Sequence, residues 1–342
     1  MGTGTSMDIN DTALLDAVEL LAAFAAKTLS PLQALQGVTE RIARKNPEIN
    51  AFATLNPAAL ADARESTRRW HTGTARALEG VPVTVCDQLD IAGLPVRDGH
   101  IAAQDAALVR QLRAAGAVIL GKTTVFSSDA APLRGITRNP WNVAHLAGCG
   151  AAAAAAGFFG PLHVSASTSD ELFVAASWSG VVGFKASSVP AGIVARTVQD
   201  VALLAGVIGQ IPDSSTGQTG MREMILGVWQ PAPCAALDVA QALLPAQGVK
   251  LVPLSDPAEL GVVDALLCSA GGVSAPLVAQ ADTVLPAAPW RQSLPAASVG
   301  LTLPVGVGAQ GLPLGVLLSA PVGQEVGVLC LAQMLERCVN EL

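Results

Sequence analysis

A strand–helix–strand succession near residue 100 restricts the fold of this chain more than any other sequence feature. An apolar run over 81–86, entered from Gly80, is typical of a buried strand. A helix expected over about 105–115 then leads through Gly116 into a second apolar run at 118–120. Since two strands connected through a helix favour parallel pairing, we predict an α/β fold in which helices cover a parallel or mixed sheet.

Local sequence signals extend this alternation along the chain. The pair Ser30-Pro31 is typical of an N-cap followed by a first-turn proline, and its helix is expected to run to about Lys45 and to end at the following Asn-Pro pair. Six alanines over 151–156 favour a helix, and a polar loop is expected over 209–222. Further helices are expected over about 11–26, 57–70, 169–176 and 324–340, and further strands over 180–185, 225–228, 250–252, 265–268, 297–303 and 314–318.

A high apolar content and a low charge narrow the class of protein. Hydrophobic residues make up 51% of the chain and charged residues 14%, so a large core must be buried and a protein partner or a second copy is expected to cover part of the surface. The formal net charge of -7, without a basic stripe, argues against nucleic acid as a partner. The sequence lacks an apolar stretch of about 18 residues, so we expect no membrane span.

The start of the chain and its cysteines bear on location and cofactors. The polar first residues lack the apolar segment of a secretory signal, and the six cysteines form no CxxC pair and lie at no ligand spacing from a histidine. We therefore expect a cytoplasmic protein with reduced thiols and no metal site. No phosphate-binding glycine loop of the P-loop or dinucleotide type is found, so no cofactor is expected.

The division into domains is expected to be simple. Residues 1–6 are interpreted as a tag remnant or a disordered N-terminus. Residues 7–342 are interpreted as a single compact domain, because the sequence contains no internal repeat and no clear linker.

Eight short segments in order resemble the amidase signature family. Each is weak alone, but their combined order and spacing hold from about residue 10 to residue 340. The resemblance implies the amidase-signature α/β fold, with a mixed twisted sheet covered by helices on both faces. It also implies amide hydrolysis by a serine nucleophile, a second serine as proton relay and a lysine base. The segments that carry it are 80–87, 90–95, 109–123, 138–142, 180–185, 195–200, 294–298 and 311–316.

The positions that match the family's base and relay hold other residues. The lysine position is Cys86, in a register fixed by Gly80 on one side and Asp87 on the other. The relay serine falls on Gly150, or near Ala147 when the count runs back from the later strand. In either register the residue is not serine, because no serine occurs between residues 142 and 163.

The nucleophile position is Glu171, and the two glycines whose N–H groups stabilise the oxyanion in the family are replaced by Ser169 and Asp170. The acids would place negative charge where an oxyanion develops. A structural alternative is that Thr168 with Glu171, and Ser167 with Asp170, form capping boxes at a helix start.

A cysteine between two glycines is the other candidate. Cys149 lies between Gly148 and Gly150 at an expected helix N-terminus, where its pKa could be lowered and its thiol reactive. Both Cys149 and Cys86 are equally well explained as small core residues. We take Gly148, Gly150, Ser169 and Asp170 as the residues that would line a ligand in the cleft.

Two functions remain open at this point. The three substituted positions, together with shortened segments after Lys185 and between about 209 and 263, predict a catalytically degenerate amidase-like protein, a pseudoenzyme. It would act as a structural or regulatory subunit of a complex, with a small-molecule ligand in the residual cleft. The alternative is an enzyme in which Cys86 and Glu171, with Cys149 nearby, act on a small amide, acid or acyl substrate.

Overall fold

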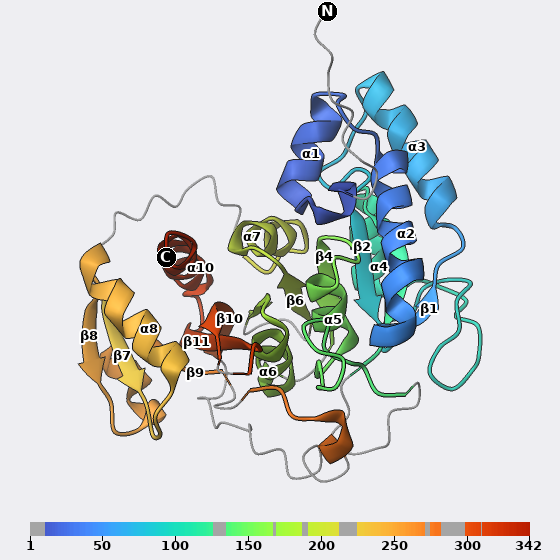
Figure 1. Ribbon diagram of the computed structural model, residues 1–342. Coiled ribbons are helices and arrows are strands. Elements are labelled where there is room, and N and C mark those ends of the chain that lie inside the picture. The colour runs from blue at the N-terminus through green and yellow to red at the C-terminus, as the bar shows by residue number, and fades with distance from the viewer. Residues whose placement is uncertain are drawn as a thin grey trace, which may run out of the picture.

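The strands form one mixed sheet. The computed structural model describes residues 11–125, 135–166, 169–186, 191–211, 224–270, 274–281, 298–308 and 310–342. The strands of these parts are β1 (Phe52–Leu55), β2 (Pro82–Cys86), β3 (Val118–Thr123), β4 (Leu162–Ser165), β5 (Val182–Lys185), β6 (Gly192–Ala195), β7 (Ile225–Trp229), β8 (Lys250–Pro253), β9 (Ala265–Ser269), β10 (Ser298–Val307) and β11 (Pro313–Pro321). Their order across the sheet is β1-β3-β2-β4-β6-β5-β10-β11-β9-β7-β8 (Figure 1).

Parallel pairs lie in two parts of this sheet. β2 pairs in parallel with β3 and β4, and β7 pairs in parallel with β8 and β9, whereas the other neighbours are antiparallel. In the β2–β3 pair Val83 faces Ile119 and Cys86 faces Thr123. The predicted strand–helix–strand unit and the mixed sheet are confirmed. The register places the last residues of β2 and β3 at the same edge of the sheet.

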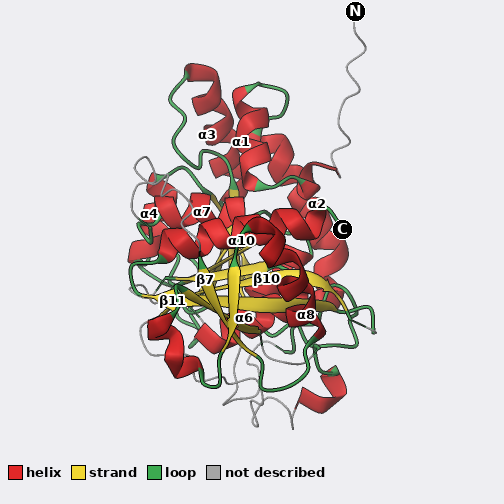
Figure 2. Ribbon diagram, turned by 90° about the vertical axis from the view of Figure 1, so that its left-hand side faces the viewer, coloured by secondary structure: helices red, strands yellow, loops and turns green. Residues whose placement is uncertain are grey.

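Helices cover both faces, as predicted. The apolar sides of α4, α7, α8 and α10 share one core cluster with the sheet, and α5 and α6 lie in other clusters. Figure 2 shows α7 and α10 on one side of the strands and α6 on the other. The helices are α1 (Ala17–Ala25), α2 (Pro31–Ile49), α3 (Ala59–Thr72), α4 (Ala107–Ala114), α5 (Gly150–Ala156), α6 (Ser169–Ser179), α7 (Val198–Val207), α8 (Ala235–Leu243) and α10 (Glu325–Asn340), with 3-10 turns at Asp11–Leu14, Leu244–Gln247, Pro257–Val262 and Val278–Gln280.

Small residues let α6 approach the sheet closely. A Cβ atom at Gly300 of β10 would overlap the ring of Phe173, and one at Gly183 of β5 would lie 2.8 Å from the Cβ atom of Ala176. Real Cβ atoms do not come so close, so both glycines are required for this helix to dock. Phe173, which replaces an arginine of the family pattern, is buried in this contact.

Two helices differ from their predicted bounds. α2 continues through Pro47 to Ile49, because the buried Ile49 and the left-handed conformation of Asn50, with φ 57°, complete a last turn. The segment 11–26 divides into a 3-10 turn and α1, since Asp16 caps α1 in a capping box with Glu19.

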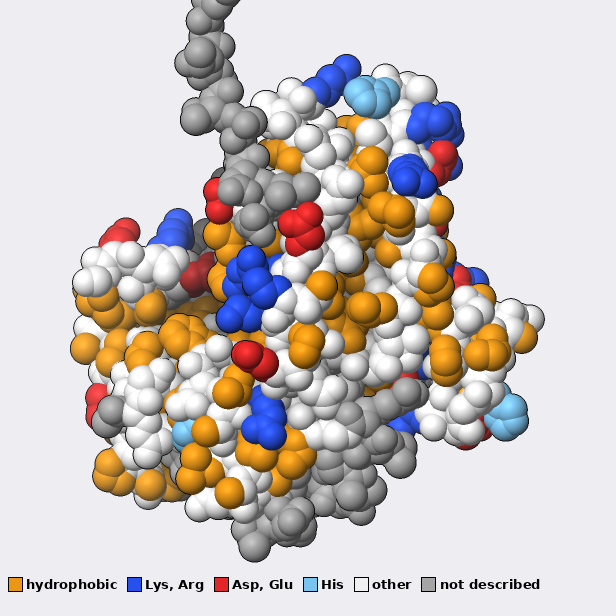
Figure 3. Space-filling view, turned by 45° about the vertical axis from the view of Figure 1, so that its right-hand side comes forward, with side chains coloured by type: hydrophobic (Ala, Val, Ile, Leu, Met, Phe, Trp, Pro, Cys, Tyr) orange, Lys and Arg blue, Asp and Glu red, His pale blue; other side chains and the backbone are white. Residues whose placement is uncertain are grey.

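Charged side chains are sparse on the surface. Figure 3 shows one face on which basic side chains stand apart from one another among acidic, apolar and uncharged surface. Residues 1–6 lie outside the described residues, as does most of the polar loop predicted over 209–222. The division into a short N-terminal piece and one compact domain stays a prediction.

Candidate active site

Three elements bring Cys86, Cys149 and Glu171 into one region. Cys86 ends β2, Cys149 is the N-cap of α5, and Glu171 lies in the first turn of α6. Burial, assisted by the charges of Cys86 and Glu171, raises the pKa of Cys149 to about 11. α5 packs against both β2 and α6, so the three residues lie in the same part of the molecule. That these three residues form a catalytic set stays a prediction.

Backbone donors and a cation around Cys86 oppose the effect of burial on its pKa. Burial raises the pKa of Cys86, but backbone N–H groups of Gln88, Ala166 and Leu89 and the charge of Lys122 act in the opposite direction. N–H groups of the first turn of α5 also lower the pKa of Cys149, yet the two acidic groups beside it oppose them. Of the two thiols, Cys86 is thus the one with a cation and three donors facing it.

Lys122 is the functional neighbour that sequence reasoning missed. Its side chain is fully buried, its Nζ atom lies 3.1 Å from Oδ1 of Asp87, and it donates a hydrogen bond of 3.0 Å to the carbonyl oxygen of Pro95. The signal was present in the sequence. Asp87 follows the end of β2 and Lys122 lies at the end of β3, so parallel pairing brings a cation to the edge where Cys86 lies.

Both thiols are covered by side chains. Cys86 is 2% exposed and Cys149 is 1% exposed, while Glu171 is half-buried. Whether the former cleft is open or filled could not be read from sequence. Among the described residues, Glu171 is partly exposed, whereas Cys86 and Cys149 are buried.

The predicted ligand-lining residues are placed only in part. Gly148 has a positive φ of 86° just before the helix, and Gly150 is the first residue of α5. The backbone N–H of Gly150 donates to the carbonyl oxygen of Thr124 at 2.9 Å. Ser169 and Asp170 open α6, but their side chains and the proposed cap residues 167 and 168 lie outside the described residues.

A buried histidine lies one strand away from Cys86. His163 of β4 is fully buried, with Nε2 3.1 Å from the carbonyl oxygen of Gly160 and Nδ1 2.8 Å from the hydroxyl of Thr84. A carbonyl oxygen only accepts, so Nε2 carries the proton and Nδ1 accepts from Thr84. Burial, assisted by the charge of Arg196, lowers the pKa of His163 to about 3.

This histidine should make the fold sensitive to acid. The folded pKa lies below the ordinary value near 6.5, so the unfolded chain binds the proton more tightly, and stability falls as the pH drops from about 6.5 toward 3. Urea unfolding of the wild type and of His163→Gln at pH 7.5, 6.0 and 5.0 measures this contribution. We expect the variant to lose less of its unfolding free energy over this range. Equal losses in both proteins would contradict the assignment to His163.

Metal ligands do not gather in the described part of the chain. No group of three or more His, Cys, Asp or Glu residues there is arranged to hold a metal ion. In the same residues, no helix is long and apolar enough to cross a membrane.

Comparison with known proteins places this geometry in a family. Residues 33–224 match the family model for amidases. A putative amidase of Mycobacterium tuberculosis, AmiA2, is 33% identical over 215 residues, covering 54% of this chain and 44% of the relative. A glutamyl-tRNA(Gln) amidotransferase subunit of Acidothermus cellulolyticus is 33% identical over 240 residues, covering 61% of this chain and 48% of the relative.

The solved structures give the same fold. The peptide amidase from Stenotrophomonas maltophilia superimposes with a TM-score of 0.80 and 21% sequence identity, over 97% of this chain and 98% of that one. The sheet, the helices on its two faces and the matched segment define an α/β protein of the amidase type. This chain belongs to the amidase family.

These relatives correct the predicted function. They are named as amidases and as an amidotransferase subunit, which are enzymes, so the interpretation of the chain as a pseudoenzyme without catalytic function is wrong. The prediction of a non-enzyme rested on the substituted serine and lysine positions, and these substitutions alone do not exclude catalysis. The name of one relative marks it as a subunit of a complex, which is in keeping with the expectation of a protein partner. The chain spans about half the length of the curated relatives it matches.

Proposed function

We propose that this chain is an amidase that hydrolyses a carboxamide with a thiol, that of Cys86, in place of the family's serine. The observation that carries the proposal is that Cys86 and Glu171, which occupy the positions of the family's base and nucleophile, both act electrostatically on the neighbouring Cys149 at the start of α5, which packs against β2 and α6. Membership of a family whose named relatives are amidases supports the reaction type.

The proposed chemistry uses groups that this chain contains. Glu171 takes the proton of the Cys86 thiol, and the thiolate adds to the carbonyl carbon of the amide. The C–N bond then breaks, and the amine leaves with the proton returned by Glu171. Water, deprotonated by the same carboxylate, hydrolyses the thioester, which releases the carboxylic acid and restores the thiol.

The surroundings of Cys86 and the protonation of Glu171 support the roles of nucleophile and base. The charge of Lys122 and the three backbone N–H groups around Cys86 stabilise its thiolate against the effect of burial. Negative charge at Glu171 would repel a developing oxyanion. The carboxyl group becomes neutral when it accepts the thiol proton, so the repulsion is absent at the step where the oxyanion forms.

Thiol alkylation tests the proposal. A Cys330→Ser background removes the exposed cysteine of α10, and ammonia release from a panel of primary carboxamides is measured before and after treatment with iodoacetamide. Because Cys86 is 2% exposed, its alkylation is expected to be slow. We expect ammonia release to be lost in parallel with alkylation of Cys86, as mapped by mass spectrometry, and the alkylation to be slower when substrate is present.

The outcomes that contradict the proposal are equally defined. Ammonia release that persists after Cys86 is fully alkylated would exclude its thiol as the nucleophile. A protein that releases no ammonia from any carboxamide, either alone or as copurified from its native host, would exclude the reaction.

The same proposal includes a protein partner and a cytoplasmic location. The name of one relative, which marks it as part of a complex, and the light charge of the chain support the partner. The six free cysteines are in keeping with a reducing compartment. Ammonia release that requires copurified protein would favour the partner, and full activity of the purified chain would argue against any need for one.

A further inference from the structure

A polar pocket lies at the opposite end of β2 and β3 from Cys86. α3, the segment before β2 and the connection from α4 to β3 enclose a cavity of about 170 Å³. A strand advances about 3.3 Å per residue, so the length of β2 alone separates the two ends of the sheet by roughly 15–20 Å. The cavity can hold several water molecules or one small anion. It is lined by three arginines, Arg69, Arg76 and Arg113.

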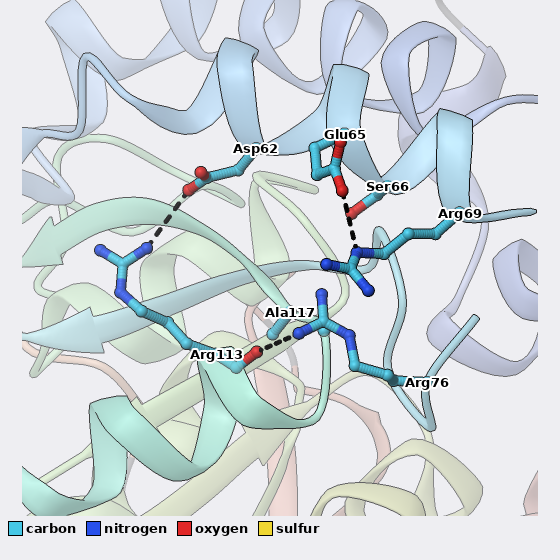
Figure 4. A pocket seen from close by; sticks show the side chains of 8 residues that line it. Asp62, Glu65, Ser66, Arg69, Arg76, Arg113 and Ala117 are labelled. Carbon is cyan, nitrogen blue, oxygen red and sulfur yellow. Dashed lines mark hydrogen bonds and ion pairs between the residues drawn. The ribbon is translucent and has the colours of Figure 1, made fainter. Parts of the chain in front are cut away.

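Acidic groups hold two of these arginines in fixed orientations. Arg113 donates from Nε to Oδ2 of Asp105 at 3.0 Å and from Nη1 to Oδ2 of Asp62 at 3.3 Å. Arg76 donates from Nε to Oε2 of Glu79 at 2.6 Å and from Nη1 to the carbonyl oxygen of Arg113 at 2.9 Å. Figure 4 shows both guanidinium groups facing the pocket below α3. Their positions are therefore set before any ligand arrives.

The buried carboxylate of Glu79 holds Arg76 in position. Its side chain is fully buried and accepts a hydrogen bond of 2.6 Å from the hydroxyl of Ser66. Burial alone would raise the pKa of Glu79, but the hydrogen bonds from Arg76 and Ser66 lower it below its ordinary value. The carboxylate is ionised at neutral pH and keeps Arg76 in place.

Arg69 forms an ion pair with Glu65 that leaves its Nε donor without a hydrogen bond. Its Nε atom is buried and lies 3.2 Å from Oε1 of Glu65, but it makes no hydrogen bond with a described residue. Glu65 already accepts two hydrogen bonds from Arg68, at 2.6 and 2.8 Å. The ion pair with Glu65 does not meet hydrogen-bond geometry, so an acceptor oxygen of a ligand would satisfy this buried N–H.

We propose that the pocket binds a phosphate group, either as inorganic phosphate or as a monoester, through Arg69, Arg76 and Arg113. Guanidinium groups are planar forks that match phosphate oxygens with pairs of hydrogen bonds. The three side chains are between 31% and 36% exposed, so a ligand from solvent reaches them. The charge of the three arginines is balanced by the carboxylates of Asp62, Glu65, Asp105 and Glu79. A phosphate therefore competes with these acids, and the expected affinity is only in the millimolar range.

Titration at constant ionic strength tests this site. Thermal unfolding midpoints and calorimetric titrations are measured with inorganic phosphate, with glycerol phosphate as the monoester, and with acetate for comparison. We expect saturable stabilisation by both phosphates and none by acetate, because binding to the folded state raises its stability by mass action. Tighter binding of the monoester would identify an esterified phosphate as the ligand, and equal binding would identify free phosphate.

Two adjacent arginines of α3 provide the matched pair of variants. Arg69→Gln should weaken phosphate binding at least about tenfold, whereas Arg68→Gln, which changes a side chain 61% exposed, should leave it unchanged. Absence of saturable stabilisation, or an equal loss of binding in the two variants, would overturn the proposal. Neither residue takes part in the thiol chemistry, so the result is independent of the amidase assay.

Discussion

Cys86→Ala is expected to lower the rate of carboxamide hydrolysis at least about a hundredfold, because it removes the proposed nucleophile. The change deletes one buried sulfur atom at the end of β2, so its cost in unfolding free energy should stay near about 1 kcal/mol. Ammonia release measured at saturating substrate, together with a urea unfolding curve of the same preparation, separates loss of chemistry from loss of fold.

Two further variants define what this result means. Cys330→Ser changes an exposed thiol of α10 and should retain the full rate. Glu171→Gln keeps the shape of the side chain but cannot accept a proton, so kcat should fall strongly while KM changes little. Full activity of Cys86→Ala would contradict the assignment of the nucleophile. A similar loss in Cys330→Ser would show that the assay responds to thiols in general.

Gly150→Ser is expected to destabilise the protein by about 2–3 kcal/mol, although serine is the family's residue here in one of the two registers. A Cβ atom at Gly150 would lie only 2.5 Å from both the backbone nitrogen and the hydroxyl of Thr124, and it would overlap the carbonyl oxygen of Ala51. Two of these three atoms belong to the backbone and cannot move aside as a flexible side chain would. Unfolding in urea measures the loss.

The control for this substitution is a glycine with open space around it. Gly206 of α7 has no atom within 4 Å of the site of a Cβ, and Gly206→Ser should be neutral or slightly stabilising because it reduces the freedom of the unfolded chain. A Gly150→Ser protein as stable as the wild type would show that α5 can shift. The relay serine could then be restored in this chain.

The fold was predictable because its signals are local and repeated. The apolar runs at 81–86 and 118–120 flank a helix, and this pattern alone predicts the parallel pair β2–β3. β1, β4 and β6 were missed. Each has only four residues, and β4 contains a histidine that is buried in the fold, where burial and the charge of Arg196 lower its pKa.

The residues of the candidate site could be predicted from the sequence, but their burial and their charged neighbours could not. Counting along the family pattern located Cys86 and Glu171, and the structure places Cys149 beside both. The burial of the thiols and the approach of Lys122 depend on how strands distant in sequence are paired, which single-sequence patterns do not encode. The arginine pocket was missed for the same reason, since its residues come from three separate segments.

Two tryptophans, Trp70 and Trp178, lie in the parts of the molecule that contain the two proposed sites, and their fluorescence can be followed separately. The chain has five tryptophans and no tyrosine, so its ultraviolet emission comes from indole rings. Trp70 donates a 3.0 Å hydrogen bond to the carbonyl oxygen of Glu79, directly beside the arginine pocket, while Trp178 is fully buried in α6, the helix that carries Glu171. Single-tryptophan versions of this protein would therefore report phosphate at one end and substrate at the other by separate changes in fluorescence.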